Sequence, residues 1–375
     1  MARLHASSCD GHRTMIGRAN EEARCTMAHA VLPPAFPANL PGDRLVGITT
    51  TVPIEVIYAA GLIPIDLNNL FVTSPEPLTL AEQAERAGFP RTSCCWTKGI
   101  YGAIKQSGIR RVLGVTRGDC SSAEALLEVL RHEGTDCLTF FYPERQSEAD
   151  MHHALEDFAK ALGTDLQEAE RWRERLAPAR AAAADIDRLS WEDDKVAGLE
   201  NHLWLVSASD FCGDPEHYRA AAAEFAALAR RRSPIRHSLR LGICGIPPIV
   251  PDLYEFVEAM GALVVYNETQ RQFAMIEPAD SLAEQYSRYT YPYGVFPRIE
   301  DIRAECERRR LDGLIHYVQS FCHRRIEDRI IRQRVQVPVL TVEGDRPGPL
   351  SGQLKTRLEA FVQILAARKS GRAVL

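Results

Sequence analysis

The sequence has 375 residues, of which 45% are hydrophobic and 25% charged, with a formal net charge of −5. A chain of this length exceeds what one hydrophobic core usually holds, so two or more packed lobes are expected. No half of the chain is strongly basic, which argues against a nucleic-acid partner, and no apolar run approaches the ~20 residues that cross a bilayer. The arginine runs 230–232 and 308–310 are interpreted as solvated helix ends.

The N-terminal stretch differs from the rest of the chain. Residues 1–40 contain no hydrophobic signal core and include "VLPPAFP", so they predict a poorly ordered extension. Cytoplasm is then the expected compartment. Because that compartment is reducing, the ten cysteines are not expected to form a disulfide framework. Buried thiols, catalysis and metal binding are the functions left open to them.

Short apolar runs alternate with helical patterns over residues 41–145. Strands are expected in "RLVGIT", "LIPIDL", "IRRVLGVT" and "DCLTFFY", and helices in "PIEVIYAAG", "WTKGIYGAIKQSG" and "SSAEALLEVLRHEG". Ser121 or Ser122 is a candidate N-cap of the last of these helices. This alternation predicts a parallel sheet with helices on both faces.

The pattern changes twice more along the chain. Residues 146–236 carry Ala- and Leu-rich tracts at helical spacing and predict a helical segment. Residues 237–375 return to alternation, from the strand "LRLGICG" through "DGLIHYV" to the helix "QLKTRLEAFVQILAARK". The predicted fold class is therefore α/β, with two Rossmann/flavodoxin-like lobes and a helical insert between them.

Three cysteines stand out by position, two of them at the carboxyl ends of parallel strands, where such folds bind ligands, and one at the start of a helix. Cys120 lies between a strand and a helix in the first lobe, Cys322 has the same position in the second, and Cys94 opens a helix. The positive end of a helix dipole favours a thiolate. These residues predict a three-thiolate site in a shared cleft, with a buried structural thiol as the alternative for each. Cys244 is a reserve ligand, and no CxxC pair indicates a zinc ribbon or a ferredoxin cluster.

Several motifs, taken in order, resemble the 2-hydroxyacyl-CoA dehydratase / benzoyl-CoA reductase family from about Leu45 to Leu365. "GITTTVPIEVIYAAGLIPIDL" is similar to the family's opening segment. "CCWTKGIYG", "GDCSSAEALLEVL" and "HYVQSFCHRRIED" are similar to its three cluster-ligand segments, and the first of them selects Cys94 over Cys95. "PVLTVEGDRPGPLSGQLKTRLEAFVQIL" resembles its C-terminal segment. Thr49, Thr51 and "YNETQRQFAM" depart from the family pattern, which bears on the substrate more than on the cluster.

The resemblance implies a [4Fe-4S] cluster, or a double-cubane [8Fe-9S] cluster, on Cys94, Cys120 and Cys322, with one iron left open. It implies an ATP-hydrolysing iron–sulfur activator that delivers a low-potential electron, and an (R)-2-hydroxyacyl-CoA thioester that passes through a ketyl radical and loses its hydroxyl group. It also implies a dimer with a homologous dehydratase-type subunit or with a second copy. The alternatives are a homodimeric double-cubane reductase of small molecules, a benzoyl-CoA reductase-like subunit, and a non-catalytic electron-transfer or assembly subunit.

Two residues near the opening helix are candidates for catalysis. Glu55 follows Pro53 and is the candidate acid/base or hydroxyl-orienting group, or else a first-turn glutamate that complements the helix dipole. Thr50 is expected to hydrogen-bond substrate or to cap that helix.

Residues of the second lobe have less specific expected roles. His323 is an ordinary helix-start histidine or a hydrogen-bond partner of a cluster sulfide. Gln353 and Arg357 are expected to tie the last helix to Glu343 and Asp345.

Overall fold

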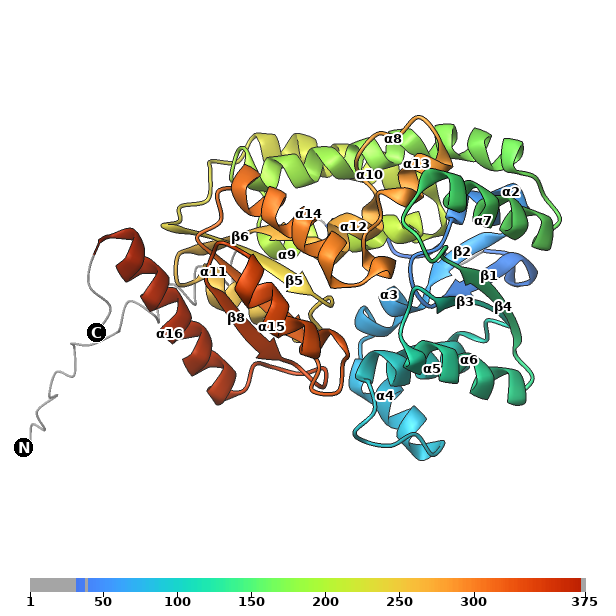
Figure 1. Ribbon diagram of the computed structural model, residues 1–375, viewed down its shortest axis with the longest axis horizontal. Coiled ribbons are helices and arrows are strands. Elements are labelled where there is room, and N and C mark those ends of the chain that lie inside the picture. The colour runs from blue at the N-terminus through green and yellow to red at the C-terminus, as the bar shows by residue number, and fades with distance from the viewer. Residues whose placement is uncertain (1–31, 38–39, 372–375) are drawn as a thin grey trace, which may run out of the picture.

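Two parallel sheets organise the chain, whose computed structural model describes residues 32–37 and 40–371 (Figure 1). The sheets have four strands each, and every pairing within them is parallel. This confirms the predicted class of two α/β lobes. The predicted extension, with Cys9 and Cys25, lies largely outside the described residues. The predicted lobe boundaries at 41–145, 146–236 and 237–375 stay a prediction.

The first sheet has the strand order β2-β1-β3-β4. Its strands are β1 (Leu45–Ile48), β2 (Ile63–Asp66), β3 (Arg111–Arg117) and β4 (Asp136–Phe141). The helices among them are α2 (Ile54–Ala59), α3 (Leu67–Val72), α4 (Pro77–Arg86), α5 (Cys95–Ser107) and α6 (Ser121–His132). Side chains alternate between the faces, so that Ile48 and Val115 pack with α2 while Val112 packs with α5 and α6.

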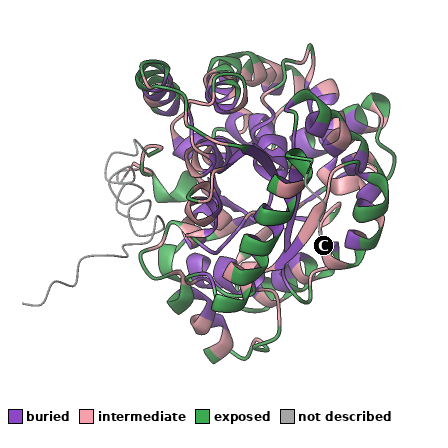
Figure 2. Cartoon of the chain, turned by 90° about the vertical axis from the view of Figure 1, so that its left-hand side faces the viewer, coloured by how far each residue is buried: buried purple, intermediate pink, exposed green. Residues whose placement is uncertain are grey.

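The second sheet repeats this order as β6-β5-β7-β8. Its strands are β5 (Leu239–Gly245), β6 (Ala262–Asn267), β7 (Gly313–Val318) and β8 (Val339–Glu343). Its helices are α11 (Leu253–Glu258), α12 (Glu268–Ala274), α13 (Leu282–Ser287), α14 (Val295–Arg308), α15 (Arg324–Arg334) and α16 (Gly352–Lys369). One face of the sheet packs on α11 and α16, and the opposite face packs on α14 and α15. Figure 2 shows the strands buried beneath helices whose outer faces are exposed.

A helical segment lies between the two sheets in sequence and consists of α7 (Glu148–Ala161), α8 (Leu166–Trp191), α9 (Gly198–Val206) and α10 (Pro215–Arg230). The long helices α8 and α10 run side by side along the upper edge in Figure 1. Helix α8 reaches both lobes, because it packs on α2 near the first sheet and on β6 in the second. No helix in the described ranges combines the length and apolarity that crossing a membrane requires.

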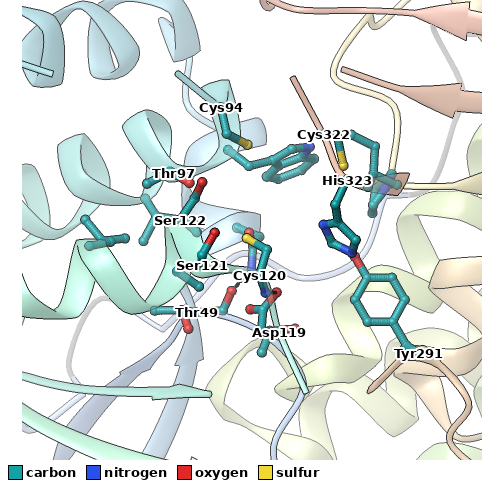
Figure 3. A pocket seen from close by; sticks show the side chains of 18 of the residues that line it. Thr49, Cys94, Thr97, Asp119, Cys120, Ser121, Ser122, Tyr291, Cys322 and His323 are labelled. Atoms are coloured by element: carbon teal, nitrogen blue, oxygen red, sulfur yellow. Dashed lines mark hydrogen bonds between the residues drawn. The ribbon is translucent and has the colours of Figure 1, made fainter. Parts of the chain in front are cut away.

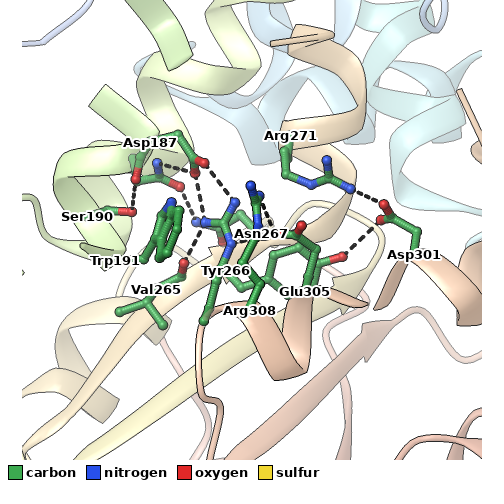
Figure 4. A network of polar contacts seen from close by, with 12 residues as sticks. Asp187, Ser190, Trp191, Val265, Tyr266, Asn267, Arg271, Asp301, Glu305 and Arg308 are labelled. Carbon is green, nitrogen blue, oxygen red and sulfur yellow. Dashed lines mark hydrogen bonds and ion pairs between the residues drawn. The ribbon is translucent and has the colours of Figure 1, made fainter. Parts of the chain in front are cut away.

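The arginine run 308–310 is not the solvated helix end that the sequence predicts. Arg308 is half exposed, but Arg309 is fully buried and binds Asp187 of α8 through both terminal nitrogens, at 3.0 and 2.7 Å. Its Nε also donates to Glu305 at 2.6 Å. Figure 4 shows the surrounding network, in which Arg271 likewise pairs with Asp301. The Arg309–Asp187 pair fastens the helical segment to the second lobe, whereas the Arg271–Asp301 pair joins α12 to α14 within that lobe.

A second difference concerns the start of α6. Its N-cap is Cys120, which makes no side-chain capping bond, and Ser121 is already the first helical residue. The predicted serine cap is therefore wrong, because the helix begins one residue earlier than the capping pattern suggests. This shift places the Cys120 thiol at the end of the helix.

Candidate functional site

A cavity of about 180 Å³ lies where the carboxyl ends of both sheets face each other. In each sheet the strand order reverses beside the first strand, because β1 lies between β2 and β3 and β5 lies between β6 and β7. Such switch points leave a crevice outside the strand ends. The two central strands of each sheet are β1 and β3 in the first and β5 and β7 in the second. The residues that follow them line the cavity: Thr49 and Thr50 after β1, Asp119 and Cys120 after β3, Ile246 and Pro247 after β5, and Phe321 and Cys322 after β7.

The three predicted cysteines are brought together in this cavity (Figure 3). Cys94 is the N-cap of α5 and Cys120 is the N-cap of α6, while Cys322 directly precedes His323, the N-cap of α15. All three are free thiols of intermediate exposure. Two of them come from the first lobe and one from the second, so the cavity has a thiol on each side of the interlobe cleft.

The turn before Cys120 requires glycine. Gly118 has φ +100°, and a Cβ there would lie 2.9 Å from side-chain atoms of both Pro292 and Tyr142. Glycine alone adopts this backbone conformation without strain and also fits the space. The close packing then directs Asp119 and Cys120 into the cavity.

Cys120 and Cys322 are not held as thiolates in the way the helix-dipole argument predicts. Burial raises the pKa of Cys120 to about 12, with a further contribution from neighbouring Asp119. Burial also raises the pKa of Cys322, although a backbone hydrogen bond at the start of α15 opposes the shift. Desolvation therefore outweighs the helix N-termini in the metal-free protein. A metal that binds here has to displace thiol protons.

The three thiols decide which kind of metal group this cavity suits. Among the residues that the structure describes, no group of three or more His, Cys, Asp or Glu side chains is arranged to hold one metal ion. Three soft sulfur donors around one cavity match the ligand preference of iron–sulfur clusters.

Glu55 is not brought to this cavity. Its carboxylate is fully buried and accepts hydrogen bonds from Arg180 at 2.7 Å, Gln285 at 2.9 Å and Tyr286 at 2.7 Å. Burial alone would raise the pKa of Glu55, but Arg180 and these hydrogen bonds bring it below its usual value. The ionised carboxylate thus joins α2, α8 and α13, and the geometry favours a structural role.

The other predicted residues fall into two groups. Thr50 and His323 line the cavity, and Thr50 does not cap α2, whose N-cap is Pro53 without a side-chain bond. By contrast, the expected tie of the last helix to Glu343 and Asp345 is wrong. Arg357 donates to the Thr341 carbonyl at 2.7 Å.

The two loop acids bind elsewhere. Glu343 pairs with Arg325 at 2.6 Å, and Asp345 accepts from Ser320. Both contacts therefore hold the segment that carries Cys322.

Sequence reasoning missed several cavity residues. Asp66 is the last residue of β2, Asn68 lies in α3 just after it, and Trp96 follows Cys94 by two positions. The carboxyl-end rule could have found Asp66, since it ends a strand next to β1. Asp119 could have been found in the same way, and burial raises its pKa to about 6.

The fold and the cavity define a two-lobed α/β protein with a thiol-lined interlobe cleft. Comparison with known families identifies the family: the model described as "2-hydroxyglutaryl-CoA dehydratase, D-component" matches residues 49–365. The match covers most of the chain, and the chain belongs to this family. The three cysteines, Thr50 and Glu55 all lie within the matched residues.

Comparison with individual proteins adds no further assignment. No match was found among curated proteins. The SBP FpvC from P. aeruginosa is 12% identical over 88% of this chain and 99% of its own, with a TM-score of 0.23. The laminin-binding adhesin Lmb from Streptococcus agalactiae is 11% identical over 86% and 99%, with a TM-score of 0.20. Scores this low carry no inference about fold or function.

Proposed function

We propose that this chain is an iron–sulfur subunit of a 2-hydroxyacyl-CoA dehydratase-type enzyme, with a [4Fe-4S] cluster held by Cys94, Cys120 and Cys322. One observation carries the proposal: these thiols, far apart in sequence, line a single cavity at the facing switch points of two sheets. Family membership supports the dehydratase class. The cluster, when bound, supplies one-electron reduction of the substrate thioester.

In this proposal the chain contributes position, charge and exclusion of water. The N-termini of α5 and α6 present backbone N–H groups and positive dipole ends beside Cys94 and Cys120, which favours their thiolates once iron has displaced the protons. Apolar walls such as Ile246 and Phe273 keep bulk water from the site. Thr50, which lines the cavity, is proposed to hydrogen-bond a substrate oxygen. The acid/base role of Glu55 stays a prediction.

The proposal also includes partners and location. The electron comes from an ATP-hydrolysing iron–sulfur activator, and the chain pairs with a homologous subunit or with a second copy in the cytoplasm. The substrate class is an acyl-CoA thioester with a 2-hydroxyl group. A double-cubane reductase would use the same thiols, so metal content and turnover have to be measured separately.

Iron binding is the first test. Protein purified without oxygen is expected to hold about four irons per chain, or about eight per dimer, with brown charge-transfer absorption. The Cys322→Ser variant is expected to hold almost none. Cys306→Ser is the matched control, because Cys306 lies on the buried face of α14, in the hydrophobic cluster that includes β6, and does not line the cavity. Full iron retention in Cys322→Ser would overturn the proposal.

Turnover is the second test. With reduced activator, ATP and candidate 2-hydroxyacyl-CoA thioesters, formation of a 2-enoyl-CoA supports the dehydratase assignment. Failure with every thioester, combined with reduction of acetylene or hydrazine, would replace it with the double-cubane reductase. Iron binding with neither activity would favour the non-catalytic electron-transfer role.

A further inference from the structure

Gln319 joins the two lobes beside the thiols. It lies in the loop between β7 and α15, is 3% exposed, and accepts a hydrogen bond from the Cys95 backbone N–H at 2.8 Å. Its own backbone carbonyl accepts from the Cys322 N–H at 3.0 Å. The side chain and backbone of one residue therefore connect the start of α5, where Cys94 is the N-cap, to the Cys322 loop.

The amide nitrogen of Gln319 has a different environment. Its Nε2 is buried and has no hydrogen-bond partner among the described residues. Leaving a buried donor unpaired costs about 1–3 kcal/mol, and such groups are rare in folded proteins. The Cys95 N–H needs an acceptor, so the atom of the Gln319 side-chain amide that faces it has to be the oxygen. Exchanging the amide oxygen and nitrogen would therefore break this hydrogen bond.

Trp96 shows the same feature on the other side of the cleft. It lines the cavity two residues after Cys94, and its indole Nε1 is buried without a hydrogen-bond partner in the described chain. The ring packs edge-on against Phe71, with centroids 5.6 Å apart. The indole N–H is a donor only, so its missing partner has to be an acceptor.

The two unpaired donors thus lie within three residues of two of the proposed ligands, one in each lobe. Each is an N–H group, and neither has an acceptor within the described protein. A cluster with thiolate ligands is rich in sulfur acceptors, and hydrogen bonds to those sulfurs raise its reduction potential because they stabilise the more negative reduced state.

We propose that Trp96 and Gln319 are positioning residues that donate N–H···S hydrogen bonds to the cluster or its thiolates, and that Gln319 also fixes the two ligand segments relative to each other. This inference rests on the proposed function, since it requires the cluster. It assigns roles to two residues that neither the family match nor the cysteine pattern identifies.

Trp96→Phe tests the indole donor. The substitution keeps an aromatic ring against Phe71 and removes only the N–H side of the indole. The expected result is a more negative midpoint potential in an anaerobic redox titration, with the iron content unchanged. Trp172→Phe is the matched control, because Trp172 stacks on Tyr58 away from the cavity and should leave the potential unchanged. An unchanged potential in Trp96→Phe would overturn this half of the inference.

Two variants separate the roles of Gln319. Gln319→Glu keeps an acceptor for the Cys95 N–H but loses the amide donor and adds charge, whereas Gln319→Leu loses acceptor and donor without adding charge. Both variants are expected to lower the midpoint potential of the cluster, because both lose the amide donor. In the metal-free protein, hydrogen exchange at the Cys95 amide should stay slow in Gln319→Glu and become faster in Gln319→Leu. An unchanged potential in Gln319→Leu would refute donation, and unchanged exchange would refute the bridge.

A measurement on the unsubstituted protein covers the case in which a variant does not fold. Protein labelled with ¹⁵N in the tryptophan indole and the glutamine amide is expected to show ¹⁵N coupling to the reduced cluster spin. Absence of both couplings would overturn the inference even if iron is bound. Absence of iron from the wild-type protein would instead overturn the proposed function, so the two failures are distinguishable.

Discussion

Arg309→Met is expected to destabilise the chain strongly, because it removes the cation from a buried ion pair. Arg309 is fully buried and binds Asp187 through two hydrogen bonds and Glu305 through a third. Glu305 keeps a second partner, since Arg308 donates to it at 2.8 Å, but Asp187 loses its cation and keeps only the neutral Asn201 amide. Removing one partner of a buried pair costs about 3–5 kcal/mol.

Urea unfolding followed by tryptophan fluorescence measures this effect, and Trp191 is a local reporter because its ring lies 5.3 Å from the Arg309 guanidinium. Arg308→Met is the matched control. Arg308 is 45% exposed and its pair with Glu305 should contribute less than about 1 kcal/mol. Adding Asp187→Asn to Arg309→Met should recover much of the loss, since the uncompensated charge disappears. Equal, small losses in Arg308→Met and Arg309→Met would refute the reasoning.

Three further substitutions have outcomes that follow from local geometry. Gly102→Ala should lower the free energy of unfolding by about 1–3 kcal/mol, because its Cβ would lie 2.3 Å from the Leu80 backbone oxygen and push α4 away from α5. Gly352→Ala is the control, since a Cβ there would meet open space and should change the stability little. Thermal unfolding measures both variants. Glu55→Gln should lower the free energy of unfolding by about 3–5 kcal/mol, because Arg180 stays buried without its counter-ion, while the iron bound per folded chain should stay unchanged; activity loss without destabilisation would instead show a catalytic role. Burial lowers the pKa of His202 to about 4, so the native state binds fewer protons than the unfolded state below pH 6.5. Stability should therefore fall by up to about 3 kcal/mol as the pH drops from 6.5 to 4, and the fall should be absent in His202→Gln; an equal fall in that variant would contradict the assignment.

The strand and helix pattern predicted the fold and the meeting of the cysteines. Cys120 and Cys322 follow the third strands of their sheets, and the carboxyl-end rule places such residues in one crevice once the two sheets face each other. The helix start pointed to the Cys94–Cys95 pair, and the resemblance to the family's first ligand segment selected Cys94. Local signals were sufficient for Cys120 and Cys322, because each position depends on the element boundary beside it.

Glu55 and Arg309 could not be predicted in the same way. Their partners Arg180 and Asp187 both lie on α8, far away in the sequence. Without knowledge of such a partner, a charged residue on a helix is predicted to face solvent. The raised pKa values of Cys120 and Cys322 could not be predicted either. Helix position is visible in the sequence, whereas the burial that raises the pKa of Cys120 depends on packing from both lobes.

The division of the thiols between two lobes has a consequence for biogenesis. Cys94 and Cys120 belong to segments made early during synthesis, whereas Cys322 follows the entire helical segment. In the proposed holoprotein, cluster insertion has to wait until nearly the whole chain has been translated and both lobes have docked. The iron content would then report the fraction of chains that have folded completely. Arg309→Met, although remote from the cavity, should therefore lower the fraction of chains that bind iron.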